Sequence, residues 1–364
     1  MDQDIAISNY KKLTVNHPYL KLAINRLGLA IRQARKGNIV FMFGPTGVGK
    51  STLASHMKNI INSEFQGGGG YDRSILPAEV VEAPYSDAQK FSWKDFYRRA
   101  LTVLHDPLAH KKVNDPRCSA FEWKARTDKG APGYELRLAF ENAIKNRKLR
   151  VLLFDEAHHI AKGASESELK GQLEYLKSLA NLTETVIVLV GTYDLLSFRN
   201  LSGQLSRRSF DVHFPRYQIN DKDEYHCFGG VVKSFASKLP IQCDFKMTDI
   251  IEDLYVGSLG CVGTLNDWII KAIEVAVAEG NGVLKKKDLI TSMFSYDQMS
   301  KMIDEVLEGE KLLIQPVNSL ELLKTRLGIS GEGSAKICDN NKEQPKKFIP
   351  FKRKPMRDSV GVVS

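Results

Sequence analysis

A glycine-rich loop between two apolar elements, at residues 44–52, constrains the fold more than any other part of this sequence. It reads GPTGVGKST and matches the pattern G-x-x-x-x-G-K-[ST] from Gly44 to Ser51. The apolar run NIVFMF precedes the loop, and the helical pattern TLASHMKNIINSEF comes after it. This order of strand, loop and helix is the context in which the pattern cradles phosphate, so we expect a parallel α/β sheet built around it.

The residue types in the loop explain the chemistry that we predict for it. The glycines allow tight turns that bring backbone N–H groups close to phosphate oxygens, and the helix N-terminus adds partial positive charge. Lys50 is predicted to reach the β- and γ-phosphates, and Ser51 to supply a hydroxyl to Mg²⁺. The cofactors are therefore predicted to be ATP and Mg²⁺. The predicted nucleotide-binding residues are Gly44, Pro45, Thr46, Gly47, Val48, Gly49, Lys50, Ser51 and Thr52.

Further apolar runs and helical patterns alternate along the first 220 residues. Besides NIVFMF, the predicted strands are AEVVEA (78–83), RVLLFD (150–155), TVIVLVG (185–191) and VHFPRY (212–217). Helical patterns such as those at 134–146 and 166–181 lie between them. Strands that alternate with helices indicate a mostly parallel, five-stranded sheet covered by helices on both faces.

After about residue 221 the strand patterns fade and helical patterns take over. The chain is predicted to divide into an N-terminal helical segment (1–37), an α/β nucleotide-binding domain (38–220), a helical lid domain (221–327) and a disordered basic tail (328–364). The tail segment PKKFIPFKRKPMR (345–357) contains basic residues and no acidic one. It is either a second DNA contact, a peptide that docks on a partner, or a tail without a role.

Two acids come directly after the apolar run RVLLF, in the stretch VLLFDEAHHI. P-loop enzymes hold Mg²⁺ with an acid on a neighbouring strand, and Asp155 is predicted to be that acid. Glu156 is predicted to orient and polarise the attacking water, while His158 and His159 are interpreted as structural or interfacial. The letters D-E-A-H also occur in a class of RNA helicases. Such a helicase needs a second RecA-like domain, which the helical residues after 220 do not provide.

Polar and basic residues near two further strands complete the predicted catalytic set. Thr192 ends the run VIVLVG and is either a sensor of the γ-phosphate or an N-capping threonine. Arg207 and Arg208 precede the last predicted strand, where an arginine can reach a neighbouring subunit's nucleotide and stabilise transition-state charge. The sequence does not distinguish between these two arginines, and a solvated arginine pair is the alternative.

The net charge of the chain allows two interpretations. The 364 residues carry a formal net charge of +9, with a pI of about 9.1, which indicates either a polyanionic partner or a mildly basic protein. The five cysteines form no C-x-x-C pair, so neither a zinc site nor a disulfide framework is expected. No membrane span or signal peptide is recognisable, and we expect a cytoplasmic protein without a membrane partner.

A basic insertion at about 84–133 is the predicted DNA-binding segment. Basic residues outnumber acidic ones there, and aromatic residues such as Trp93 and Trp123 are interleaved. Lysines and arginines would neutralise phosphates without reading bases, which predicts salt-sensitive, sequence-tolerant binding to double-stranded DNA. A solvated basic surface over aromatic core residues is the alternative. The candidate DNA contacts are Arg98, Arg99, Lys111, Lys112, Arg117, Lys124 and Arg126.

Taken in order, these features resemble the AAA+ family of P-loop NTPases, with a C-terminal helical lid. More narrowly, the blocks GNIVFMFGPTGVGKSTL, LLFDEAHHI, VIVLVGTYDLL and LSRRSFDVHFPRY resemble the TnsC/TniB group of bacterial transposition regulators, including those of CRISPR-associated transposons. The resemblance covers about residues 12–275. It implies an ATPase that forms a homo-oligomeric ring or helical filament on double-stranded DNA. It also implies that the oligomer links a TniQ-like target selector to a transposase, and that hydrolysis disassembles it.

One departure from the AAA+ pattern concerns the lid. AAA+ lids often carry a sensor arginine at the start of a late helix, whereas the matching stretch GSLGCVGTLNDW has none. Thr264 or Asn266 is expected near the nucleotide instead. A replication initiator or helicase loader of similar architecture is the alternative function, although no helix-turn-helix DNA reader is recognisable. A nucleotide switch without turnover is disfavoured because it does not need Glu156. Nothing in the sequence indicates whether a guide-RNA complex selects the target.

Overall fold

A computed structural model of the chain describes residues 2–35, 38–66, 72, 74–85, 90–106, 132–199, 201, 209–280, 282–314 and 319–328. Residues 1–314 form one compact unit and residues 315–364 a second. Of the second unit the structure describes one short helix, α14 (Ser319–Arg326), together with the two residues directly after it.

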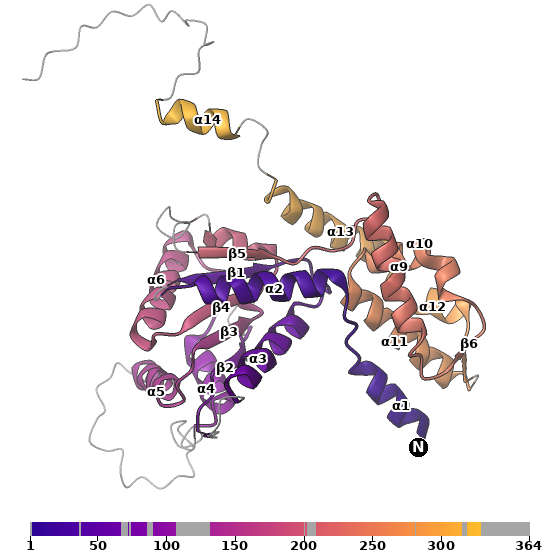
Figure 1. The fold of residues 1–364 in the computed structure, drawn as a ribbon, viewed down its shortest axis with the longest axis horizontal. Coiled ribbons are helices and arrows are strands. Elements are labelled where there is room, and N and C mark those ends of the chain that lie inside the picture. Colours follow the sequence, from indigo (N-terminus) through magenta and orange to yellow (C-terminus); the bar gives the residue numbers. More distant parts are fainter. Residues whose placement is uncertain are drawn as a thin grey trace, which may run out of the picture. The chain divides into compact units, whose positions relative to one another are not determined.

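The centre of the first unit is a parallel sheet whose five strands are β1 (Ile39–Phe43), β2 (Ala78–Glu82), β3 (Val151–Asp155), β4 (Val186–Gly191) and β5 (Ser209–His213). Their order in the sheet is β2-β3-β4-β1-β5, and every pairing is parallel (Figure 1). All five residues of β1 are buried, as expected for a central strand with helices on both faces. The predicted five-stranded parallel sheet is therefore confirmed.

Helices cover the two faces of this sheet. The helices and short turns of the α/β part are α2 (Pro18–Gln33), α3 (Lys50–Gln66), α4 (Trp93–Val103), α5 (Pro132–Asn146), η1 (Ala157–Ile160), α6 (Glu166–Thr183), η2 (Tyr193–Leu195) and α7 (Leu196–Arg199). One face of the sheet packs against α2 and α3, through Val40 and Met42 of β1. The other face packs against α4, α5 and α6 through Ile39, Phe41 and Phe43.

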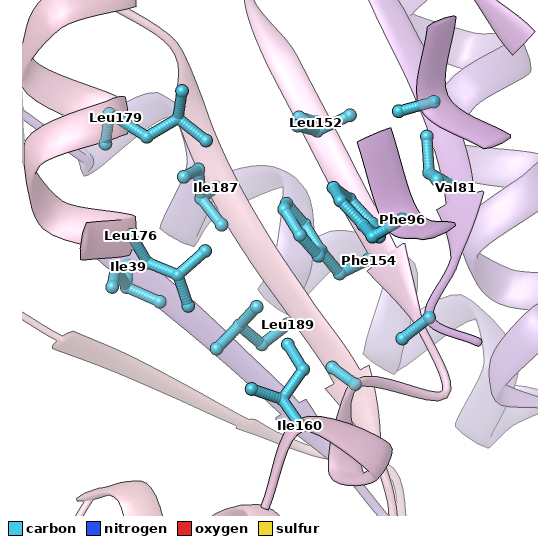
Figure 2. Close-up of a cluster of buried hydrophobic side chains, with 14 of the residues drawn as sticks. Ile39, Val81, Phe96, Leu152, Phe154, Ile160, Leu176, Leu179, Ile187 and Leu189 are labelled. Atoms are coloured by element: carbon cyan, nitrogen blue, oxygen red, sulfur yellow. The ribbon is translucent and has the colours of Figure 1, made fainter. Parts of the chain in front are cut away.

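Figure 2 shows the core on the second face, where side chains of β1–β4 point toward α4 and α6. Phe96 of α4 stacks on Phe154 of β3, with ring centroids 4.6 Å apart and planes within 8°. Leu176 and Leu179 of α6 pack with Ile187 of β4. This packing places the carboxyl ends of β1, β3 and β4, which carry the predicted site residues, side by side at one edge of the sheet.

The predicted last strand, VHFPRY at 212–217, is wrong in position. The observed strand runs from Ser209 to His213, in register with Ile39–Phe43, and so begins three residues earlier. Pro215 has no backbone N–H to donate to a ladder, so the strand cannot continue through it. The apolar residues after His213 are buried outside the sheet. Phe214 packs beside the glycine-rich loop, and Tyr217 lies in a separate helical core.

That second core is helical and comes after the sheet in the sequence. Its elements are α9 (Lys222–Ala236), η3 (Met247–Ile250), α10 (Ile251–Ser258), α11 (Val262–Ala278) and α12 (Lys286–Ser292), with the short parallel pair β6 (Gln242–Cys243) and β7 (Val283–Leu284). The N-terminal helix α1 (Asp2–Lys11) joins it, because Tyr10 and Val15 are buried there. The described part of the predicted segment 1–37, residues 2–35, thus contributes to two cores, since α2 packs on the sheet.

A last helix of the first unit, α13 (Tyr296–Lys311), packs against η2, the turn directly after β4. Ser295 and Gln298 form a capping box that begins it. Arg216, after β5, makes two hydrogen bonds of 3.0 and 3.2 Å to the carboxylate of Glu310, and a third of 3.1 Å to the hydroxyl of Tyr255. Among the described residues, no helix is both long and apolar enough to cross a membrane.

Candidate functional site

The glycine-rich loop joins β1 to α3, as its sequence predicts, and its glycines are required by its geometry. Gly47 and Gly49 have φ values of +76° and +107°, in the region that side chains other than glycine rarely adopt. A Cβ on Gly44 would lie 2.2 Å from the carbonyl oxygen of Phe214. The loop therefore keeps its shape only with small residues at these positions.

Lys50 begins α3 and bends back over the loop. Its Nζ donates hydrogen bonds to the carbonyl oxygens of Gly44 and Pro45, at 3.1 and 2.8 Å, and the residue is 7% exposed. Burial lowers the pKa of the amine, while the charges of Glu156 and Asp155 oppose that shift. The ammonium is thus held inside the loop, opposite the two acids.

Asp155 is the last residue of β3 and lies against the first turn of α3. Burial raises the pKa of its carboxyl, and a hydrogen bond from the Ser51 hydroxyl works in the opposite direction. Its Oδ1 also accepts a bond of 2.9 Å from the backbone N–H of Glu156. The structure thus brings together the two predicted Mg²⁺ ligands, a hydroxyl and a carboxylate. These two oxygen donors fit Mg²⁺, which usually binds to only one or two protein side chains and fills the rest of its coordination shell with water and phosphate oxygens.

Glu156 occupies a strained backbone position immediately after the strand. Its φ and ψ are 52° and 32°, left-handed values that cost a residue with a side chain about 1–2 kcal/mol. Such strain persists where the surrounding structure enforces it, often at functional sites. The side chain is 38% exposed, so water can reach the carboxylate.

Thr192 lies at the end of β4, next to the acid pair in the sheet order. It occupies the N-cap position of η2, but its side chain makes no capping hydrogen bond. Its Oγ1 is buried, and it has no hydrogen-bond partner among the described residues. The geometry therefore favours the sensor interpretation over the capping one, because the hydroxyl is available to a ligand.

A cleft of about 720 Å³ opens beside these residues. The loop residue Thr46, His158 of η1 and Thr192 line one side of it, and Glu305 and Gly309 of α13 line another. The sequence did not associate α13 with the site. Its contacts depend on a close approach between Gly309 and Tyr193 that no local pattern encodes.

A smaller, mostly apolar cavity of about 60 Å³ lies on the other side of the loop. His17 and Phe214 line it; their rings stack with centroids 6.2 Å apart, and Nδ1 of His17 shares a 2.9 Å hydrogen bond with the Tyr217 hydroxyl. Burial lowers the pKa of His17 to about 4, so its ring is neutral near pH 7. These residues were missed because 200 positions separate His17 from Tyr217, although the apolar runs around them were visible.

The lid residues singled out in the sequence both lie beside the loop. The backbone N–H of Thr264 donates to the carbonyl oxygen of Gly47 at 2.9 Å. Asn266 lines the smaller cavity, and its Oδ1 is buried without a hydrogen-bond partner among the described residues. The start of α11 therefore closes over the loop with an amide oxygen free to bind a ligand.

Of the predicted DNA contacts and the two predicted intersubunit arginines, the structure describes only Arg98 and Arg99. Arg98 and Arg99 lie on α4, where Arg98 contacts Asp95 at 3.4 Å and Arg99 is exposed. The aromatic neighbours Phe96 and Tyr97 are core residues. The remaining candidates, Arg207 and Arg208 together with Lys111, Lys112, Arg117, Lys124 and Arg126, lie outside the described residues.

Comparison with known proteins agrees with this geometry. Residues 32–198, which contain the glycine-rich loop, the acid pair and Thr192, match the model of a family described as AAA domain. This part of the chain is therefore similar to an AAA domain. Its parallel sheet, flanking helices and C-terminal helical region are those of the AAA+ P-loop fold, so the predicted fold class is confirmed.

Several solved structures are similar to most of the chain at low sequence identity. The Walker-type ATPase PABY2304 of Pyrococcus abyssi is 16% identical, with a TM-score of 0.44, 84% of this chain covered and 75% of that one. The ORC2 protein of Aeropyrum pernix is 14% identical, with a TM-score of 0.46 and coverages of 75% and 65%. A structure of Drosophila ORC bound to DNA is 11% identical, with a TM-score of 0.44 and coverages of 90% and 84%. Among curated protein sequences there is no match.

Proposed function

We propose that this protein hydrolyses ATP with Mg²⁺, and that it regulates DNA transposition by assembling on double-stranded DNA. The observation that carries the ATPase part is the convergence at one sheet edge of Lys50, the Ser51–Asp155 pair and Glu156. The parallel sheet brings these residues together because the loop after β1 and the end of β3 lie at the same edge.

Each residue has a defined task in this proposal. Lys50 exchanges its bonds to the carbonyl oxygens of Gly44 and Pro45 for phosphate oxygens of ATP. Ser51 and Asp155 would hold Mg²⁺, and the bound ion would supply charge that neutralises the phosphates. Glu156 orients and polarises the attacking water, and Thr192 contributes its unbonded hydroxyl to the γ-phosphate side.

The smaller cavity is the proposed contact site for one edge of the adenine base, which would extend into the adjoining groove because about 60 Å³ is too little for a whole purine ring. Its walls are Val15, Phe214 and Val262, and Asn266 offers an amide oxygen that can accept a hydrogen bond from an amino group. The polar groove next to it, about 510 Å³ between α2 and α3, shares Thr52 with this cavity and suits the ribose. ATP would thus lie from the base cavity across the loop to the acid pair.

DNA as the partner is supported by the charge of +9 and by the resemblance to TnsC/TniB regulators. The same resemblance is the basis for the finer proposals: a homo-oligomeric ring or filament, a transposase and a TniQ-like target selector as partners, and an arginine at 207 or 208 that acts on a neighbouring subunit's ATP. The binding is proposed to tolerate sequence, because lysine and arginine contacts to phosphates carry no base information.

Electron microscopy of the purified protein on duplex DNA tests this proposal. With ATP or a slowly hydrolysed analogue, we expect rings or filaments on duplexes of unrelated sequence. Lys50→Ala should abolish them, whereas Lys170→Ala, on the exposed face of α6, should not. Monomers alone under these conditions would contradict the assembly proposal.

Mixing experiments assign the arginine that acts between subunits. A variant of Arg207 or Arg208 that lacks turnover alone should regain it when mixed with Lys50→Ala subunits, because each contributes the part that the other lacks. Absence of recovery for both variants would contradict an intermolecular role.

A further inference from the structure

The two histidines after the acid pair have different surroundings. Nδ1 of His159 has a hydrogen-bond partner, since it shares a 2.9 Å hydrogen bond with the carbonyl oxygen of Ala83. The His159 ring also packs edge-on against the ring of Tyr85. His158 is buried, and its Nδ1 lies 3.1 Å from Oε2 of Glu156. That distance is within hydrogen-bonding range, but the contact does not have the geometry of a hydrogen bond, and Nδ1 lacks a hydrogen-bond partner among the described residues. A buried polar atom without a partner, beside a carboxylate, requires an explanation.

The backbone holds His158 at this place. Glu156 turns the chain through its left-handed conformation, and the N–H of His159 then donates to the carbonyl oxygen of Glu156 at 3.0 Å. The next strand fixes the turn from the other side, since a Cβ on Gly191 would lie 3.1 Å from the backbone N of His158. His158 therefore faces Glu156 because of the fold and not because of a flexible side chain.

The protonation state of His158 suits a hydrogen bond to a working base. Burial, with a smaller contribution from the neighbouring His159, lowers the pKa of His158 to about 4. The ring is then neutral near pH 7, with one nitrogen carrying a proton. A neutral donor orients a carboxylate without the charge of an imidazolium, which would weaken the carboxylate as a base.

We propose that His158 is a positioning residue that donates its Nδ1–H to the carboxylate of Glu156 and fixes that carboxylate toward the attacking water. The Glu156 side chain is 38% exposed and the His158 side chain only 10%. A rotation of the Glu156 carboxylate toward the His158 ring would complete this hydrogen bond. The proposal rests on the proposed ATPase function, and it assigns a role to a residue that the sequence suggested was only structural or interfacial.

Three substitutions of His158 and one control at His159 distinguish positioning from support of the fold. His158→Ala should lower kcat for ATP by about ten- to a hundred-fold, with KM unchanged, because a misplaced base affects the chemical step and not binding. His158→Asn should restore most of the rate, since the asparagine amide nitrogen lies where Nδ1 does. His158→Gln places its amide near the position of Nε2 and should not restore the rate. His159→Ala is the matched control and should keep kcat near that of the wild type.

A double variant tests whether the effect passes through Glu156. If it does, His158→Ala should cause no further loss of single-turnover rate in a Glu156→Gln background. Wild-type kcat in His158→Ala, or equal rates for the Asn and Gln variants, would overturn the proposal for His158 while leaving the ATPase intact. Absence of turnover in the wild-type protein would overturn the proposed function, and with it the role of His158.

Discussion

The contact between α13 and the residue after Thr192 predicts an unusual outcome for a glycine substitution. Gly309 lies inside the helix, where alanine normally adds up to about 1 kcal/mol of stability through its helix propensity. A Cβ at this position would lie 2.1, 2.2 and 2.6 Å from Cδ2, Cγ and Cβ of Tyr193. The Cβ atom of Tyr193 cannot move without its backbone, so a change of rotamer of the Tyr193 ring would not remove the clash. We expect Gly309→Ala to destabilise the protein.

The magnitude depends on two opposing effects. Overpacking of a filled site costs ~1–3 kcal/mol, which exceeds the gain in propensity. The net loss of up to about 2 kcal/mol corresponds to a fall of a few degrees in Tm. Because Tyr193 adjoins Thr192 and its hydroxyl shares a 3.0 Å hydrogen bond with His213, displacement of the ring should also lower ATP turnover.

Thermal unfolding measured by circular dichroism compares the effect with a matched control. Gly171 lies inside α6, is exposed, and a Cβ there would meet no described atom within 4 Å. Gly171→Ala should therefore raise Tm slightly, by propensity alone. If Gly309→Ala raised Tm as much as Gly171→Ala, the packing of α13 against Tyr193 would be wrong.

Two further predictions concern buried polar groups. The pKa of His17 is about 4 in the folded state and about 6.5 when unfolded, so the unfolded state binds more protons as the pH falls. The contribution of His17 to stability should thus be fully present above pH ~6.5 and should decrease by up to roughly 3 kcal/mol toward pH ~4. The pKa of His158 is lowered in the same way and adds to the decrease in the wild type. Urea denaturation of His17→Gln should therefore show a smaller decrease with falling pH than the wild type, and an unchanged decrease would contradict the assignment. The Arg216–Glu310 pair has side chains 10% and 17% exposed, and removal of either partner should cost about 3 kcal/mol. Denaturation of Arg216→Met, Glu310→Met and the double variant should give a cost for the double that is below the sum; additive costs would mean that the pair is not coupled.

The sheet and the phosphate loop were predictable because their signals are local. A continuous apolar run such as Ile39–Phe43 is typical of a strand buried on both faces, and the spacing of the loop residues predicts the helix that begins at Lys50. The place of Asp155 at the end of its strand came from the same reasoning. The position of β5 was mispredicted because Phe214 and Tyr217 are buried in cores formed with distant residues and do not belong to the strand.

The remaining features of the site depend on contacts between distant segments. The smaller cavity is lined by both His17 and Phe214, and the cleft is lined by both Thr192 and α13, although no periodicity in the sequence relates these residues. The left-handed conformation of Glu156 is equally invisible in the sequence, because non-glycine residues rarely adopt it. The partnership of His158 and Glu156 depends on that conformation and so required the structure.

The proposed mechanism requires that Glu156 activates water while the loop and Asp155 hold the nucleotide. Its most direct test measures binding and turnover on the same preparation of Glu156→Gln, with a fluorescent ATP analogue for affinity and phosphate release for rate. We predict affinity close to that of the wild type, and turnover reduced by at least about a hundred-fold. Turnover equal to that of the wild type would contradict the role of Glu156 as the base.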